Sequence, residues 1–133
     1  MNESQTRLDK IDPKLKLAGW SKVDDSRIIT EFTISKGKIS ASEKPKPLKA
    51  DYLLSYKGVK LAVVEAKSDE LSVGEGVMQA KLYAQMLQIR YTYATNGDEI
   101  YEIDMLTGQE GIVVAFPSPN ELWQRTFGEV NQW

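Results

Sequence analysis

The stretch DYLLSYKGVKLAVVEAK, residues 51–67, carries a clear pattern of two apolar runs around a turn. Two apolar runs, Asp51 to Tyr56 and Leu61 to Ala66, flank the pair Lys57-Gly58. A short glycine-containing turn between two apolar runs predicts a tight antiparallel β-hairpin. With the turn centred near Gly58, residues whose numbers sum to about 115 or 116 should lie opposite each other, because turn length fixes the register.

This register brings polar side chains together. Asp51 should lie beside Val64 or Glu65, and Lys67 should share a face with Glu65 because side chains alternate along a strand. Two neighbouring carboxylates repel each other, and a hard divalent cation such as Mg²⁺ relieves that repulsion. A lysine beside the cation can orient a water molecule or stabilise negative charge on a phosphate. These parts suit the hydrolysis of a phosphodiester.

A simpler interpretation is a solvated surface, because Asp, Glu and Lys are mostly exposed in proteins. The neighbouring sequence favours a site instead. Glu65 directly follows the run Leu61 to Val64, which is apolar enough for an interior strand. An unpaired acid is costly in such a place unless something compensates its charge.

The segments before the hairpin contain helix, strand and loop signals. Two short helices are expected between Thr6 and Ala18, with Asp12 capping the second, Pro13 in its first turn and Gly19 ending it. Ile28 to Ile34 reads as a strand because it is rich in β-branched residues. Ser35 to Ala50 is expected to be a loop because proline and lysine interrupt it.

The segments after the hairpin predict one long helix, three strands and a final helix. The helix should span Val73 to Ile89, with a buried stripe formed by Met78, Leu82, Met86 and Ile89 and widened by Val77, Ala80, Ala84 and Leu87. Strands are expected at Tyr91 to Thr95, Glu99 to Asp104 and Ile112 to Phe116. A capping box at Ser118 to Glu121 predicts the final helix. This order predicts an α/β fold with a mixed sheet flanked by helices.

Composition limits the possible chemistry. The 133 residues suit a single domain, and the chain contains no cysteine and no histidine, which excludes thiolate and imidazole chemistry. The absence of a long apolar run predicts a cytoplasmic protein without a membrane span. The formal net charge is −2, but residues 36 to 49 carry five lysines against one acid. These lysines either lie in a solvated loop or bind phosphate groups.

The order of several motifs resembles the PD-(D/E)xK nuclease core of the N-terminal domain of type I restriction enzyme R subunits. The matching motifs are Asp51, Glu65-Ala66-Lys67, Gln79-Ala80-Lys81-Leu82-Tyr83 and Thr95-Asn96-Gly97, and the opening segment is similar at Thr6-Arg7, Ile11-Asp12-Pro13 and Ala18-Gly19-Trp20. The resemblance implies a restriction-endonuclease-like fold and Mg²⁺-dependent cleavage of double-stranded DNA. Ala50 stands where the superfamily has proline, a difference in strand entry and not in chemistry.

The resemblance also implies residue roles. Asp51 and Glu65 would be catalytic metal ligands together with the carbonyl of Ala66, and Lys67 would be the catalytic lysine. Gln79 and Tyr83 would support the motif or contact DNA. Lys44, Lys46 and Lys49 are candidate phosphate contacts. Glu3 is a candidate for an extra acid from the first helix, although we expect it not to join the site, because terminal residues are commonly disordered.

The resemblance further implies that residues 1–133 are one nuclease domain of a larger subunit. Its partners would be helicase/translocase domains of the same subunit and separate methyltransferase and specificity subunits. The sequence has no G-x-x-x-x-G-K-[ST] loop, so ATP would be used only by motor domains absent from this chain. Two alternatives remain open: a stand-alone nuclease of the same superfamily, such as a junction-resolving or repair enzyme, and a DNA-binding module that does not cut.

Overall fold

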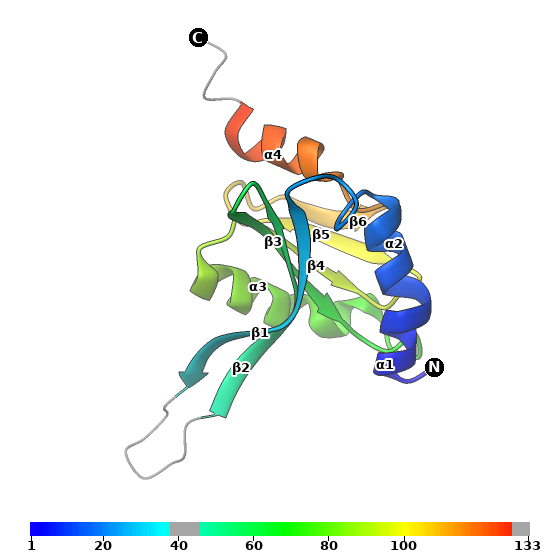
Figure 1. Ribbon diagram of the computed structural model, residues 1–133. Coiled ribbons are helices and arrows are strands. Elements are labelled where there is room, and N and C mark those ends of the chain that lie inside the picture. Colours follow the sequence, from blue (N-terminus) through cyan, green and yellow to red (C-terminus); the bar gives the residue numbers. More distant parts are fainter. Residues whose placement is uncertain (38–45, 129–133) are drawn as a thin grey trace.

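A single six-stranded sheet organises the protein (Figure 1), whose computed structural model describes residues 1–37 and 46–128. The strands lie side by side in chain order: β1 Ser26–Gly37, β2 Lys46–Tyr56, β3 Val59–Ala66, β4 Tyr91–Thr95, β5 Ile100–Asp104 and β6 Glu110–Val113. β3 and β4 are parallel, and every other neighbouring pair is antiparallel. The sheet is therefore mixed, as the sequence predicts.

Helices cover both faces of the sheet, which confirms the α/β prediction. Their bounds are α1 Glu3–Thr6, η1 Arg7–Ile11, α2 Asp12–Leu17, η2 Val73–Gly76, α3 Val77–Leu87 and α4 Pro119–Phe127. α2 and α4 pack on one face, where Leu15 and Leu122 join a core cluster with Val64. α3 packs on the other face, where Tyr83 contributes to a cluster with Val63. Neighbouring strand residues point to opposite faces, so β3 contributes to both clusters.

The hairpin of β2 and β3 has the predicted turn and register. Lys57 and Gly58 both adopt left-handed backbone angles, with φ of 52° and 79°. Tyr52 pairs with Val64 and Tyr56 with Val59. A bulge between Leu54 and Ser55 shifts the register by one, which is why both predicted sums occur.

Two predictions before the hairpin are wrong. Ser35 to Ala50 is not all loop, because β1 continues to Gly37 and β2 already begins at Lys46; the rest of that prediction lies outside the described residues. Asp12 does not cap a second helix, because α1, η1 and α2 follow one another without a break. Its carboxylate instead accepts a hydrogen bond from the hydroxyl of Tyr52.

The wide turn of η1 explains how the helix passes Pro13. In η1 the amide of Asp12 donates to the carbonyl of Arg7, five residues back. Proline has no amide to donate, and its ring would press against the carbonyl four residues earlier in a regular helix. The widened turn relieves this conflict. Gly19 then ends the segment with φ of 112°, as predicted.

The predicted buried stripe of α3 is wrong in part, because its alanines and Ile89 are buried but its other large side chains at the centre are not. Met78, Leu82 and Met86 are exposed by 75%, 48% and 40%, whereas Ala80, Tyr83 and Ala84 are buried. The helix lies close to the sheet, because alanine leaves room for a short distance between the two backbones. The first turn, Val73–Gly76, is a 3-10 helix and not part of α3.

The C-terminal elements follow the sequence signals in part. β4 has the predicted bounds, while β6 begins and ends earlier than the expected strand Ile112 to Phe116. Ser118 and Glu121 form the predicted capping box at the start of α4. Trp20 is fully buried in the core, and its indole nitrogen donates to the carbonyl of Pro117 at 2.9 Å.

Candidate active site

The candidate site lies where β2 and β3 separate. The last paired residues of this hairpin are Tyr52 and Val64. Beyond them β2 continues toward Lys46 beside β1, while β3 continues to Ala66 beside β4. Figure 1 shows β1 and β2 leaving the rest of the sheet as a two-stranded arm. Asp51 and Glu65 are the first residues beyond the last pair, so they lie in the fork between the strands.

Side chains replace the backbone ladder in this fork. The amide of Asp51 donates to Oε1 of Glu65 at 3.2 Å, and the amide of Ala66 donates to Oδ2 of Asp51 at 2.8 Å. Each carboxylate is thus fixed by the backbone of the opposite strand. The convergence of Asp51 and Glu65 expected from the register is present in the structure.

Glu65 is the most deeply buried charged group of this site. Its exposed fraction is 2%. Burial, followed by the negative charge of Asp51, raises the pKa of Glu65 to about 9. The positive charge of Lys67 acts in the opposite direction. Without further positive charge, a second carboxylate at this place therefore binds a proton near neutral pH.

Lys67 follows the last residue of β3. Its amide donates to the carbonyl of Thr95 at 2.8 Å, which fixes its backbone to β4. The stem of its side chain lies against Gly76, where an added Cβ would be 3.4 Å from Cγ of Lys67. Within residues 1–37 and 46–128, its ammonium group forms no ion pair shorter than 4 Å. The charge of Lys67 is therefore directed at the site through longer-range interactions with Glu65 and Glu3.

Gln79 and Tyr83 lie on α3, behind the fork. Nε2 of Gln79 donates to the hydroxyl of Tyr83 at 2.6 Å. Tyr83 is buried and packs in the same cluster as Ala50, which precedes Asp51, and Val63 of β3. This pair is placed to support the strands that carry the acids.

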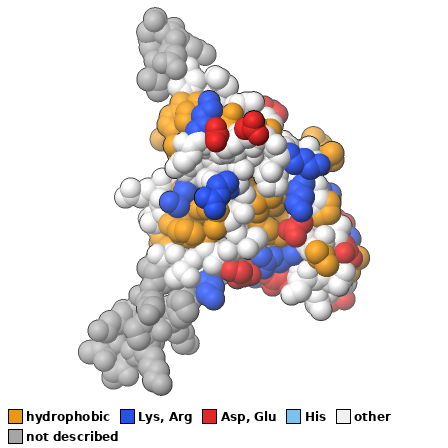
Figure 2. Space-filling model, in the orientation of Figure 1, with side chains coloured by type: hydrophobic (Ala, Val, Ile, Leu, Met, Phe, Trp, Pro, Cys, Tyr) orange, Lys and Arg blue, Asp and Glu red, His pale blue; other side chains and the backbone are white. Residues whose placement is uncertain are grey.

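The other candidates have different positions. Burial and the negative charge of Asp51 raise the pKa of Glu3, so Glu3 lies near the site. Lys49 is exposed on β2, two residues before Asp51, and Lys46 begins that strand. Lys44 lies outside the described residues. On the face drawn in Figure 2, basic and acidic side chains are interspersed, without a large area of one charge.

The oxygen atoms of the fork fit a hard divalent cation. Within the described parts of the chain, no three acidic side chains gather closely enough to hold a metal ion by themselves. Asp51, Glu65 and the carbonyl of Ala66 offer two carboxylates and one neutral oxygen. Mg²⁺ commonly binds one or two carboxylates and keeps several water molecules, so this small donor set is suitable.

Two residues at the site escaped the sequence analysis as functional candidates. Nη1 of Arg7 lies 3.8 Å from Oδ1 of Asp51, and its Nη2 donates to the carbonyl of Asp51 at 3.3 Å. Glu31 on β1 pairs with Nη1 of Arg7 at 2.6 Å. These contacts join residues 20 or more positions apart, and the sequence offered only the weak signal of Arg7 in the opening segment.

Comparisons with known proteins agree with the fold. No protein-family model matches the chain. The endonuclease subunit of the type I restriction enzyme EcoAI from Escherichia coli is 35% identical over an alignment of 125 positions, which covers 85% of this chain and 15% of that subunit. A solved fragment of a protein from Vibrio vulnificus YJ016, assigned as an HsdR subunit of a type I restriction enzyme, matches with a TM-score of 0.88 and 39% identity. That match covers 97% of this chain and 26% of the solved chain.

The comparison confirms a restriction-endonuclease-like fold, although this chain spans less than a third of the length of either relative. Among the described residues, no helix has the length and apolar character needed to cross a membrane. Sequence and structure together identify the chain as a relative of one part of the endonuclease (HsdR) subunits of type I restriction enzymes.

Proposed function

We propose that this chain is the metal-dependent nuclease domain of a type I restriction enzyme and hydrolyses phosphodiester bonds of double-stranded DNA. One observation carries the proposal: the fork holds the carboxylates of Asp51 and Glu65 side by side, each hydrogen-bonded to the opposite strand. The relatives named as endonuclease and HsdR subunits support the reaction class.

Asp51, Glu65 and the carbonyl of Ala66 would hold Mg²⁺. When bound, the ion would act as a Lewis acid on the phosphate and lower the pKa of a water molecule. The fork keeps both acids in place before the substrate arrives, so little reorganisation is needed. Burial and the charge of Asp51 raise the pKa of Glu65, and a cation held between the two acids would favour the charged form instead.

Lys67 would act on the substrate and not on the metal. Its ammonium group carries a positive charge just after β3, where it interacts with Glu65 and could hold the attacking water or stabilise charge on the phosphate. Gly76 leaves room for its stem. Gln79 and Tyr83 would support β2 and β3 from behind, with Gln79 also available to DNA at its partly exposed position.

The proposed partners follow from the relatives. DNA translocation would come from helicase/translocase domains of the same subunit, which would use ATP, and methyltransferase and specificity subunits would complete the enzyme. A cytoplasmic location stays a prediction.

The test is a plasmid-nicking assay with Mg²⁺, run on this chain alone and together with its motor domains. Asp51→Ala should abolish nicking, because it removes one ligand and one hydrogen bond of the fork. Asp104→Asn is a matched control, because Asp104 is similarly buried (14% exposed against 17% for Asp51) but pairs with Arg90 at β5. Nicking by Asp51→Ala at the wild-type rate would disprove the proposed site.

A further inference from the structure

Arg7 is a largely buried cation with five contacts around Asp51. Besides its contacts with Asp51, its Nε donates to the hydroxyl of Tyr52 at 3.4 Å, and its guanidinium lies 4.8 Å from the centre of the Tyr52 ring. The side chain is 19% exposed. Burial opposes its charge, but hydrogen bonds to Glu31 and Tyr52 raise the pKa of Arg7 above its ordinary value. Arg7 is therefore a permanent positive charge beside the site.

Glu31 holds Arg7 at some cost to the backbone. It lies in β1 between Thr30 and Phe32, which pair with Tyr52 and Ala50, so it is beside Asp51. Its φ is 53°, in the left-handed region that a side chain other than glycine rarely adopts. Such strain persists only where the surroundings enforce it, and it gathers at functional sites. In this conformation the carboxylate of Glu31 forms the short ion pair with Arg7.

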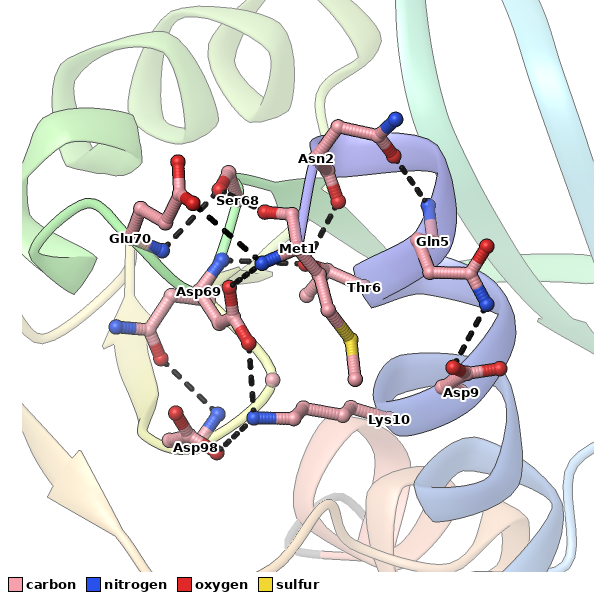
Figure 3. A network of polar contacts seen from close by, with 12 residues as sticks. Met1, Asn2, Gln5, Thr6, Asp9, Lys10, Ser68, Asp69, Glu70 and Asp98 are labelled. Atoms are coloured by element: carbon pink, nitrogen blue, oxygen red, sulfur yellow. Dashed lines mark hydrogen bonds and ion pairs between the residues drawn. The ribbon is translucent and has the colours of Figure 1, made fainter.

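The helical segment that carries Arg7 is anchored independently (Figure 3). Oγ1 of Thr6 accepts a hydrogen bond from the amide of Asp69 at 3.1 Å. Nζ of Lys10 pairs with Asp69 at 3.0 Å and with Asp98 at 2.8 Å. These contacts fix the residues on both sides of Arg7 to the ends of β3 and β4. The helix should therefore stay in place when Arg7 is replaced.

We propose that Arg7, held by Glu31, is a positioning residue that fixes Asp51 in the orientation needed for cleavage. This inference rests on the proposed function. Arg7 holds the carbonyl of Asp51, and its charge faces Oδ1, the carboxylate oxygen that the amide of Ala66 does not use. A single planar guanidinium thus links β1, β2 and the N-terminal helix at the residue that leads into the fork.

Positioning has a different signature from metal binding. A positive charge at this distance repels a cation, so removing Arg7 should not weaken metal affinity by electrostatics. Loss of orientation should instead lower the rate, because a small misplacement of Asp51 would shift the ion that it would hold relative to the phosphate, and such misplacement is costly. Lysine would keep the charge but cannot reach Glu31, the Asp51 carbonyl and Tyr52 together.

The experiment compares Arg7→Gln, Arg7→Lys, Glu31→Gln and the double variant Arg7→Gln with Glu31→Gln. The readouts are the cleavage rate at saturating Mg²⁺ in the presence of the motor domains, Mn²⁺ affinity by electron paramagnetic resonance, and stability in urea. Arg90→Gln is the control, because Arg90 is equally buried at 19% and pairs with Asp104 away from the fork.

We expect Arg7→Gln to lower the rate about 10- to 100-fold while Mn²⁺ affinity is retained. Arg7→Lys should not restore the rate, and Glu31→Gln should add no further loss to Arg7→Gln, because it acts through the same contact. Arg90→Gln should lower stability and leave the rate unchanged.

Three results would overturn the inference alone: a wild-type rate in Arg7→Gln, full rescue by lysine, or loss of Mn²⁺ affinity in parallel with the rate. If the wild-type protein neither bound Mn²⁺ nor cleaved DNA, the proposed function itself would fail, and the role of Arg7 with it.

Discussion

Glu65 links the candidate site to the stability of the protein. In the folded state its pKa is about 9, compared with an ordinary value of 4.5, because of its burial and the charge of Asp51. The folded protein thus keeps a proton that the unfolded chain releases at lower pH. The metal-free protein should therefore lose stability as pH rises from about 4.5 to about 9.

Glu65→Gln should remove this loss and make the metal-free protein more stable than wild type at pH 8. Urea unfolding at several pH values with a chelator present measures both effects. Asp104→Asn is the control. Arg90 lowers the pKa of Asp104, so the stability contributed by the charged carboxylate of Asp104 is lost only in acid. An equal decline with pH in wild type and Glu65→Gln would show that Glu65 is charged in the folded protein.

Lys67 should behave differently from the acids. Lys67→Ala should lower the cleavage rate by about 10² to 10³. Its Mn²⁺ affinity should not fall, because an ammonium group repels a cation. Lys67→Arg should not restore the rate, since a wide planar group replaces a compact charge.

Cleavage rates and Mn²⁺ titrations of the three proteins measure this difference. Lys81→Ala is the control on α3, where Lys81 pairs with Glu110 at 2.7 Å. A large loss of metal affinity in Lys67→Ala would instead show that Lys67 contributes to metal binding.

The sequence predicts those contacts between single residues that depend on local backbone geometry. The turn at Lys57-Gly58 brings Asp51 opposite Val64 or Glu65, and the bulge between Leu54 and Ser55, which the sequence does not predict, selects Glu65. Arg7 and Glu31 could not be found in this way, because their contacts with Asp51 depend on how the first helix packs on the arm. Neither residue stands in a local pattern that indicates its partner.

At the scale of elements, α3 shows why a helical period is not enough. The helical period predicts a stripe centred on Met78, Leu82 and Met86 with Ala80 and Ala84 at its edge, whereas the buried face is centred on Ala80, Tyr83 and Ala84. The larger side chains would bury more area, but the smaller ones let the helix approach the sheet. The distance between the helix and the sheet determines which side chains are buried, and this distance cannot be derived from a single sequence.

The turn between β4 and β5 offers a test of close packing. Gly97 has φ of 89°, and an added Cβ would lie 2.8 Å from Cβ of Lys10 and 2.9 Å from Cγ2 of Thr6. Gly108 has a similar φ of 82°, but no atom lies within 4 Å of an added Cβ. Both substitutions to alanine strain the backbone, and only one forces the N-terminal helix away.

Gly97→Ala should therefore lower the free energy of unfolding by about 1 to 3 kcal/mol more than Gly108→Ala. Urea unfolding of the two variants measures the difference. Because the displaced segment carries Arg7, Gly97→Ala should also slow cleavage. Equal losses of stability would mean that the helix does not need the close approach at Gly97.

The net charge of the molecule provides no general attraction to DNA. The net charge is −2, yet residues 36 to 49 hold five lysines and one acid. The described end of this stretch is the start of β2, and Lys49 lies there two residues before Asp51. Lys49 is exposed at the described end of this stretch.

Replacing Lys44, Lys46 and Lys49 with glutamine should weaken DNA binding about equally for all sequences and flatten its salt dependence. Each phosphate contact contributes roughly 0.9 to the slope of log affinity against log salt. Titrations at several salt concentrations, with the motor domains present if the chain alone binds too weakly, measure both quantities. The control replaces Lys22, Lys57 and Lys60, which changes the charge equally at the opposite end of the hairpin. A wild-type salt slope in both triple variants would mean that the lysines are only solvated. An equal flattening in both variants would mean that the effect comes from net charge and not from a phosphate contact beside the fork.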